Sequence, residues 1–212
     1  YFVTLGSRGA DNQTEFNRQR DKIISAITTL DADIVGLMEI ENHSTDAALQ
    51  DLVNGLNTAA GAGTYAYVDT GVLGTDAIKV ALIYKPGRVS LVGSELSNTD
   101  AVFSRPPLAQ TFEQTSTGEH FTVIVNHFKS KGCDGATGLD ADQGDGQGCY
   151  NATRVNQANA LTAWINATVI PNTLGANGDP DVLIIGDLNA YAMEDPITTI
   201  KNAGYVDMLN TF

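Results

Sequence analysis

The sequence predicts an α+β fold in which β-sheets are covered by helices. Segments with a strand pattern outnumber those with a helix pattern, and the helices occur singly between strands. This order favours sheets with helices on their faces over a helical bundle. No internal repeat, long low-complexity tract or domain boundary is visible, so residues 1–212 indicate one domain.

Helical periodicity identifies the segments that cover the sheets. In the first of them, Phe16, Ile23, Ile27 and Leu30 fall on one stripe. Gly61 and Gly63 end the second and Gly204 ends the last. We expect helices at residues 16–30, 47–59, 152–168 and 196–203.

Short apolar or alternating runs bounded by turn residues predict the strands. Pro86-Gly87 closes one run, and Thr117-Gly118 marks a hairpin between two others. We expect strands at residues 33–40, 65–68, 78–84, 89–92, 109–113, 120–128 and 181–185, and a loop at residues 171–180.

Composition limits the classes of function. Hydrophobic residues make up 42% of the chain and charged residues 17%, which is typical of a globular protein. The apolar runs are far shorter than the roughly 20 residues that cross a bilayer, so we expect no membrane partner. The net charge of −13 argues against a module that holds duplex DNA on a basic surface. It favours phosphate chemistry in which metal ions supply the positive charge.

The two cysteines, Cys133 and Cys149, enclose a segment rich in glycine and aspartate. A disulfide closing this loop would contribute about 3 kcal/mol, and two free thiols are the alternative. With the acidic composition, the disulfide indicates a secreted, extracellular or periplasmic protein.

Glu39 ends the apolar run DIVGLMEI. A carboxylate at the tip of a buried strand is held on rigid backbone, which suits a metal ligand. A solvated loop acid is the alternative.

Asp187 and Asn189 follow the run VLIIG. Their spacing places both side chains on the same side of the strand end, where they can hold a water or a phosphate oxygen. The alternative is an ordinary turn, which both residue types favour.

His127 follows the strand FTVIVN and precedes Lys129 and Lys131. A histidine beside two lysines is suited to contact a phosphate and to transfer a proton. Taken alone, a histidine with a structural role is the alternative.

Read together, the three strand-end motifs LMEIEN, IVNHFKSK and IIGDLNAYAMEDP resemble those of the endonuclease/exonuclease/phosphatase superfamily. The stretches NRQRDKI, GTDAIKVALIYKP, FSRPPLAQTF and NHFKSKGC are similar to bacterial extracellular nucleases. The resemblance covers nearly the whole chain. It implies two packed, mostly antiparallel sheets flanked by helices, a four-layer α/β/β/α sandwich with the active site at one edge.

The resemblance also implies roles for residues at matching positions. Glu39 would bind the metal, Asp187 would orient or deprotonate the attacking water, and Asn189 would hold the scissile phosphate. His127 would contact that phosphate or act as an acid. Further matches are phosphate- or substrate-binding roles for Asn126, Arg105, Lys129 and Lys131, and a histidine-orienting role for Asp76.

Two motifs of the family are not found. The asparagine of the family's first strand has no match, because the chain begins at Tyr1-Phe2, and the late Asp-His pair has none before Phe212. We therefore expect a domain that lacks the start of its first strand and its last strands.

Oxygen ligands favour Mg²⁺ or Mn²⁺, with Ca²⁺ as a further candidate. Asp140, Asp142 and Asp145 in LDADQGDGQG are candidate ligands of a structural calcium, although the spacing is not that of an EF-hand. A solvated acidic loop is the alternative.

The sequence thus favours a secreted metal-dependent phosphodiesterase that hydrolyses nucleic acid, DNA in preference to RNA, by in-line attack of water. One alternative is another phosphoesterase of the superfamily, a sphingomyelinase or a phosphatase. The other is a catalytically silent, acidic, metal-binding module.

Overall fold

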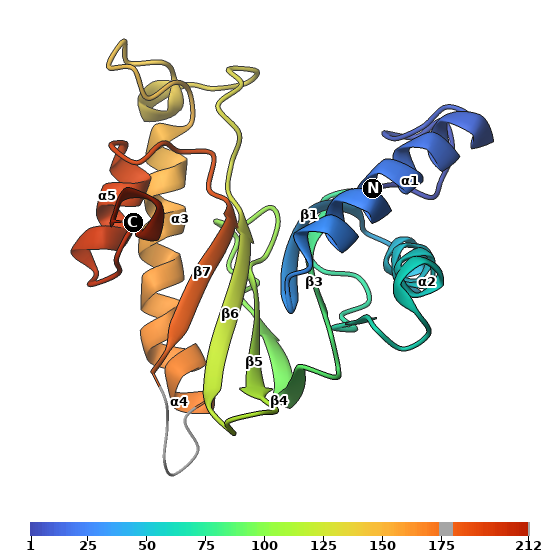
Figure 1. Ribbon diagram of the computed structural model, residues 1–212. Helices are drawn as coiled ribbons and strands as arrows, with labels where there is room; N and C mark the ends of the chain where they lie inside the picture. Colours follow the sequence, from blue (N-terminus) through green and yellow to red (C-terminus); the bar gives the residue numbers. More distant parts are fainter. Residues whose placement is uncertain (174–179, 212) are drawn as a thin grey trace.

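The architecture is known from a computed structural model that describes residues 1–173 and 180–211 (Figure 1). Seven strands form two sheets. The first sheet has the order β1-β3-β2 with antiparallel pairing throughout. Its strands are β1 (Ile34–Glu41), β2 (Ala66–Tyr67) and β3 (Ile78–Tyr84).

The second sheet has the order β4-β5-β6-β7. Its strands are β4 (Val89–Ser97), β5 (Leu108–Gln114), β6 (His120–His127) and β7 (Val182–Asp187). Neighbours are antiparallel except for β6 and β7, which are parallel. A parallel pair needs a long crossover, and the helical segment between these strands provides it.

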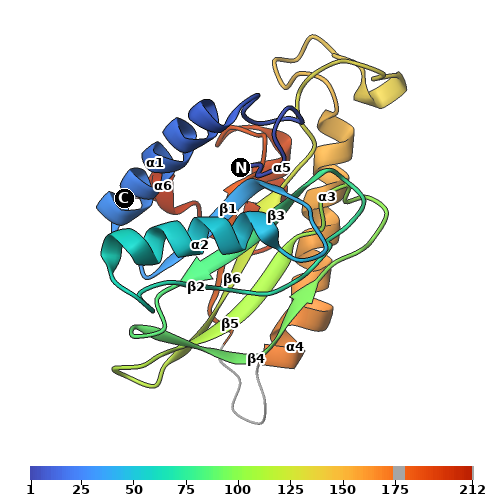
Figure 2. The ribbon, with the colours of Figure 1, turned by 90° about the vertical axis from the view of Figure 1, so that its right-hand side faces the viewer.

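Helices cover both sheets on their outer faces (Figures 1 and 2). The first sheet is covered by α1 (Gln13–Leu30) and α2 (Ala47–Ala60). The second is covered by α3 (Asn151–Trp164), its π-helical continuation Ile165–Val169, and α5 (Asp195–Asn202). Short helices are α4 (Ile170–Thr173), α6 (Met208–Thr211) and a 3₁₀ turn at Gly138–Asp140. The expected α+β sandwich of two mostly antiparallel sheets is confirmed.

Alternate side chains along each strand pack into different layers of the sandwich. In β3, Ala81 and Ile83 pack toward α2, whereas Val80 and Leu82 pack between the sheets. In β6, Val125 faces the other sheet and the neighbouring Ile124 faces α3. Because successive side chains point to opposite faces, each strand contributes to two cores.

Gly36 in β1 lets the two sheets approach closely. A Cβ atom at this position would lie 2.6 Å from Cδ1 of Ile185 and 3.1 Å from Cγ2 of Val125. The glycine in DIVGLMEI therefore brings the end of β1 toward the ends of β6 and β7.

The elements differ from the predicted ones mainly at their ends. Strand β4 extends five residues beyond the predicted Val92, with an irregular register between Val92 and Leu96. The helix after the cysteine loop continues through a π-helical turn into α4, so Pro171 to Thr173 are helical rather than part of the expected loop. The rest of that expected loop, residues 174–179, lies outside the described residues.

No helix in the described part of the chain has both the length and the hydropathy of a membrane span.

Candidate functional site

The parallel pairing of β6 and β7 brings two predicted site residues together. Asn126 is paired with Gly186, and His127 with Asp187. Parallel strands end at the same edge of a sheet, so residues 60 positions apart in sequence become neighbours. Nε2 of His127 lies 3.9 Å from Oδ2 of Asp187. The imidazole is 6% exposed, while half of the carboxylate surface reaches solvent.

Gly186 makes the close pairing of these strands possible. Its φ is +119°, a conformation that side chains disfavour. A Cβ atom at this position would lie 2.1 Å from the carbonyl O of Asn126. The glycine of the GDLN motif is therefore required by the contact between β7 and β6.

Asn189 closes a tight turn directly after β7. Its backbone has φ 48°, in the left-handed region that asparagine tolerates. Its N–H donates to Oδ1 of Asp187 at 2.9 Å, and its side-chain amide donates to the carbonyl O of Phe128 at 3.1 Å. The turn fixes one oxygen of Asp187 and leaves Oδ2 directed to the histidine side.

Glu39 stands in a bulge near the end of β1. The register of β1 with β3 shifts between Leu37 and Ile40, and Glu39 has φ 58°. A left-handed residue other than glycine costs about 1–2 kcal/mol. Its side chain is exposed and forms no hydrogen bond or ion pair with the described residues. Strain that turns a free acid outward is typical of a functional position.

The neighbouring acid Glu41 has a structural role instead. Its Oε2 accepts hydrogen bonds from the backbone N–H groups of Val3 and Thr4, at 2.8 and 3.1 Å. The two acids of the EIE sequence are thus distinguished by their surroundings, and Glu39 is the free one.

His127 is held in its neutral form. Burial lowers the pKa of the imidazole below its usual value, and the positive charge of Arg105 lowers it further. The carboxylates of Asp187, Glu39 and Asp76 act in the opposite direction and do not restore it. Nδ1 is buried and has no hydrogen-bond partner among the described residues.

Arg105 binds the backbone at the end of β6. Nε donates to the carbonyl O of His127 at 3.2 Å and Nη2 to that of Phe128 at 2.6 Å. Nη1 donates to Oδ2 of Asp76 at 3.1 Å. Phe128 O therefore receives hydrogen bonds from both Arg105 and Asn189.

Two further expectations can be compared with this geometry. Each nitrogen of the Arg105 guanidinium donates one hydrogen bond within the protein, and Nη1 and Nη2 each keep a second N–H, so its phosphate contact stays a prediction. Asp76 pairs with Arg105, and with Arg8 at 3.6 Å, so it does not orient His127 through a hydrogen bond. Among the described residues, the Asp76 carboxylate is therefore paired with arginine and not with His127.

Asn126 lies at the end of β6, where it is fully buried. Its side-chain amide donates to the carbonyl O atoms of Ile124 and Ile185 at 3.1 and 3.2 Å, while its Oδ1 has no hydrogen-bond partner among the described residues. Alternation along β6 turns Asn126 away from the face that His127 occupies. Its substrate-binding role stays a prediction, which this position does not favour.

The two lysines of NHFKSK lie beside aromatic rings. Nζ of Lys129 is 4.0 Å from the ring centroid of Tyr150, and Nζ of Lys131 is 4.5 Å from that of Tyr191. Lys131 also forms an ion pair with Glu194. Among the described residues Lys129 forms no ion pair, so of these two lysines it is the one with an uncompensated charge.

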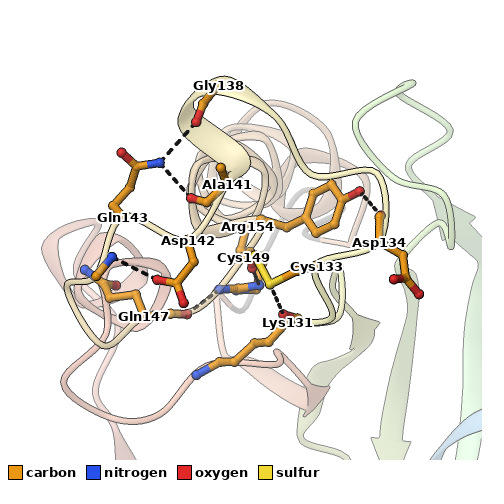
Figure 3. The surroundings of a disulfide bond; sticks show 12 residues. Lys131, Cys133, Asp134, Gly138, Ala141, Asp142, Gln143, Gln147, Cys149 and Arg154 are labelled. Atoms are coloured by element: carbon orange, nitrogen blue, oxygen red, sulfur yellow. Dashed lines mark hydrogen bonds between the residues drawn. A yellow bond between two sulfur atoms is a disulfide. The ribbon is translucent and has the colours of Figure 1, made fainter.

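The cysteines form the disulfide Cys133–Cys149, as expected (Figure 3). The fully buried Arg154 binds the loop that this disulfide closes. Its guanidinium donates to the carbonyl O atoms of Gln147 at 2.8 Å and Cys149 at 2.7 Å. Arg154 thus stabilises the loop rather than facing a substrate.

The aspartates of this loop accept hydrogen bonds from groups of the protein. Asp140 accepts from N and Oγ1 of Thr153, at the start of α3. Asp142 accepts from Gly144 N at 2.9 Å, and Asp145 from Gln147 N at 3.0 Å, each within its own turn. No group of three acids, histidines or cysteines suited to a metal occurs in residues 1–173 and 180–211, so a structural calcium here stays a prediction.

The metal site implied by the motifs can be tested against the free donors. Mg²⁺ is commonly held by one or two carboxylates, with water and substrate phosphate completing the shell. Glu39 fits this pattern, because it is an exposed carboxylate without a competing partner in the described chain. Glu39 therefore fits an open metal site, completed by water and substrate, better than a closed cage of protein ligands.

Sequence reasoning missed Glu194 and Arg8 as neighbours of the site. Glu194 meets Lys131 across 63 positions, and Arg8 meets Asp76 across 68. No local pattern marks such pairs. The one sequence feature that pointed to Glu194 was the pair of acidic residues before Pro196 at the start of α5.

Comparisons with known proteins agree with this fold and site. The model of the Endonuclease/Exonuclease/phosphatase family matches residues 7–211. The chain therefore belongs to the endonuclease/exonuclease/phosphatase family, whose members share a phosphoesterase fold. No curated protein matches the chain.

Solved structures of the same fold include enzymes with different phosphate esters. The catalytic domain of human Nocturnin is 19% identical, with a TM-score of 0.60 over 93% of this chain and 66% of its own. A mannosyl-6-phosphatase from Bacteroides thetaiotaomicron is 16% identical, with a TM-score of 0.61 over 93% and 68%. TDP2 from D. rerio, in complex with a single-strand DNA product, is 15% identical, with a TM-score of 0.53 over 93% and 62%. The chain spans about two thirds of the length of these structures.

Proposed function

We propose that the chain is the core of a divalent-metal-dependent phosphodiesterase that hydrolyses nucleic acid, DNA in preference to RNA. The observation that carries the proposal is the convergence of His127, Asp187 and Asn189 at the carboxyl ends of β6 and β7. Glu39 adds a free carboxylate whose charge acts on the same imidazole.

The residues have distinct roles in this proposal. Asp187 orients the attacking water through Oδ2, because Oδ1 is fixed by Asn189 N–H. Asn189 contacts a phosphate oxygen with the amide hydrogen that Phe128 O leaves free. His127 is neutral at pH 7, so it contacts the phosphate with a ring N–H and is available to take up a proton.

Glu39 is the residue that would hold Mg²⁺ or Mn²⁺. When bound, the metal supplies charge stabilisation at the phosphoryl and leaving oxygens, which contributes several kcal/mol. This provides positive charge that the protein, at a net charge of −13, does not provide itself.

Nucleic acid is favoured by the similarity of the stretches NRQRDKI, GTDAIKVALIYKP, FSRPPLAQTF and NHFKSKGC to bacterial extracellular nucleases. The complex of TDP2 with single-strand DNA supports this class of substrate for the fold. The disulfide supports a secreted or periplasmic protein.

A second candidate is a phosphatase acting on small phosphate monoesters. The likeness to a mannosyl-6-phosphatase supports it. The small number of basic side chains that could bind such a ligand argues against this candidate. The chain has 12 lysines and arginines, and seven of them form ion pairs with its own carboxylates.

The test compares substrates under the same conditions. Fluorescently labelled DNA, labelled RNA and a set of sugar monophosphates would each be incubated with the chain and Mg²⁺, and again with EDTA. The proposal predicts cleavage of DNA with Mg²⁺, less of RNA, and none with EDTA. Release of phosphate from the monoesters, with the DNA intact, would favour the phosphatase. No turnover by the folded chain would favour the silent module.

A further inference from the structure

Tyr191 is a large, fixed and exposed aromatic ring close to the proposed active site. It follows Asn189 by two residues in the loop between β7 and α5, and it is 77% exposed. Next to it in the same loop, Met193 is also strongly exposed. An exposed apolar surface beside a site is more informative than scattered exposed residues, because such patches mark binding surfaces.

The ring is held in place without being buried. The carbonyl O of Tyr191 accepts from Glu194 N at 2.8 Å, which closes a turn. The carboxylate of Glu194 is paired with Lys131, and the ammonium of Lys131 lies over the Tyr191 ring. The turn fixes the backbone of Tyr191, and the cation–π contact with Lys131 restricts its ring, so less conformational entropy is lost when a ligand stacks on it.

The distribution of charge opposes a surface for duplex DNA. Duplex binding depends on many basic groups that displace counterions. Here seven of the 12 basic residues form ion pairs with carboxylates in the described part of the chain, and Arg154 is buried. Single strands are held by basic groups together with aromatic rings on which their bases stack, so an exposed ring supplies affinity for unpaired bases that it cannot supply for a duplex.

We propose that Tyr191, fixed by Lys131 and Glu194, is a stacking site for an unpaired nucleobase beside the scissile phosphate, so that the chain binds single-stranded in preference to duplex nucleic acid. This inference rests on the proposed function for its substrate class. Lys129, beside Tyr150 in the segment after His127, adds a positive charge for the backbone of the same strand.

The test measures binding in EDTA, so that it does not depend on cleavage. Fluorescence anisotropy would follow a labelled oligothymidylate of about 12 nucleotides, an abasic strand of the same length, and a duplex. The variants are Tyr191→Ala, Tyr191→Phe, and Leu30→Ala as a control for an exposed apolar side chain on the helix layer of the other sheet.

Tyr191→Ala is expected to weaken binding of oligothymidylate by about 5- to 150-fold, the equivalent of ~1–3 kcal/mol of stacking. Tyr191→Phe and Leu30→Ala retain wild-type affinity, and the abasic strand binds the wild type and Tyr191→Ala equally. The proposal is overturned if Tyr191→Ala leaves oligothymidylate binding unchanged, if it weakens the abasic strand to the same extent, or if the wild type binds the duplex at least as well as the single strand. Absence of binding to all three ligands also overturns it. A chain that binds in this way but cuts no nucleic acid would contradict the proposed function alone.

Discussion

Nε2 of His127 lies 3.9 Å from Oδ2 of Asp187, and the two residues are paired in register at the ends of parallel strands. The distance exceeds that of a hydrogen bond, so neither group is occupied by a hydrogen bond to the other. Both groups are thus available to one water or phosphate oxygen beside the pair. In the proposed function the chemistry of the site depends on both.

We first predict that His127→Gln lowers kcat for DNA cleavage by about 10²–10⁴-fold, the range typical of a positioned proton-transfer group. His120→Gln is the matched control, because His120 is in the same strand and meets only Glu113. Steady-state kinetics at saturating Mg²⁺ measures the effect. Equal activity of the two variants would remove His127 from the mechanism.

Second, we predict that Glu39→Gln weakens Mn²⁺ binding, whereas Glu41→Gln does not. Glu39 is free and exposed, while Glu41 is bound to backbone N–H groups near the N-terminus. Removing a charged ligand reduces the attraction for a divalent cation. Electron paramagnetic resonance of free Mn²⁺ measures affinity without turnover. Loss of Mn²⁺ affinity in Glu41→Gln only would show that the ligand was assigned to the wrong acid.

Third, the lowered pKa of His127 makes stability depend on pH. The folded state holds this proton less tightly than the unfolded state, whose imidazole has a pKa of about 6.5. The contribution of His127 to stability is therefore fully present above about pH 6.5 and is lost as the pH falls through the lower folded pKa. Urea unfolding of the wild type should show a steeper loss between pH 7.5 and pH 5.5, values on either side of about 6.5, than unfolding of His127→Gln. Parallel curves would contradict a lowered pKa.

Fourth, Arg105 is expected to act by positioning. Arg105→Lys keeps the charge but cannot bridge two carbonyl groups and Asp76 at once. We predict a lower kcat with little change in KM, and a loss of stability of about 1.5–3 kcal/mol per lost charged hydrogen bond. An arginine that bound phosphate directly would mainly raise KM, and lysine would restore much of the binding.

Fifth, Gly186→Ala should destabilise the fold by about 2–6 kcal/mol, from backbone strain and overpacking together. The added Cβ would lie 2.1 Å from Asn126 O. Gly87→Ala is the control, because a Cβ atom there meets no described atom within 4 Å. Thermal unfolding of both variants measures the difference, and similar melting temperatures would contradict the close approach of β6 and β7.

Local patterns predicted the helices and strands well, because periodicity and turn residues act over a few positions. The strand at residues 78–84 has the expected bounds, and the helix predicted at 47–59 is one residue longer. The parallel pairing of β6 with β7 is not a local property. Only the family resemblance suggested that His127 and Asp187 meet, although the helix predicted between the two strands is the kind of crossover that a parallel pair needs.

The contacts of the predicted site residues differ in how far a sequence can reveal them, for physical reasons. Arg105 binds backbone carbonyl groups, which every residue has, so no side-chain pattern could identify them. The direction of the Asn126 side chain was predictable, because Asn126 alternates with His127 in one strand and the two side chains cannot face the same side. The loop aspartates have the residue types of a calcium loop, but aspartate equally favours the local turns that the structure contains.

The measurement that tests the central claim most directly is plasmid DNA cleavage by the wild type and Asp187→Ala, each with Mg²⁺ and with EDTA. The account predicts cutting by the wild type with Mg²⁺, and none in EDTA or by a folded Asp187→Ala variant. Cutting that persists in EDTA, or equal rates for Asp187→Ala and the wild type, would contradict a metal-dependent phosphodiesterase site at the ends of β6 and β7.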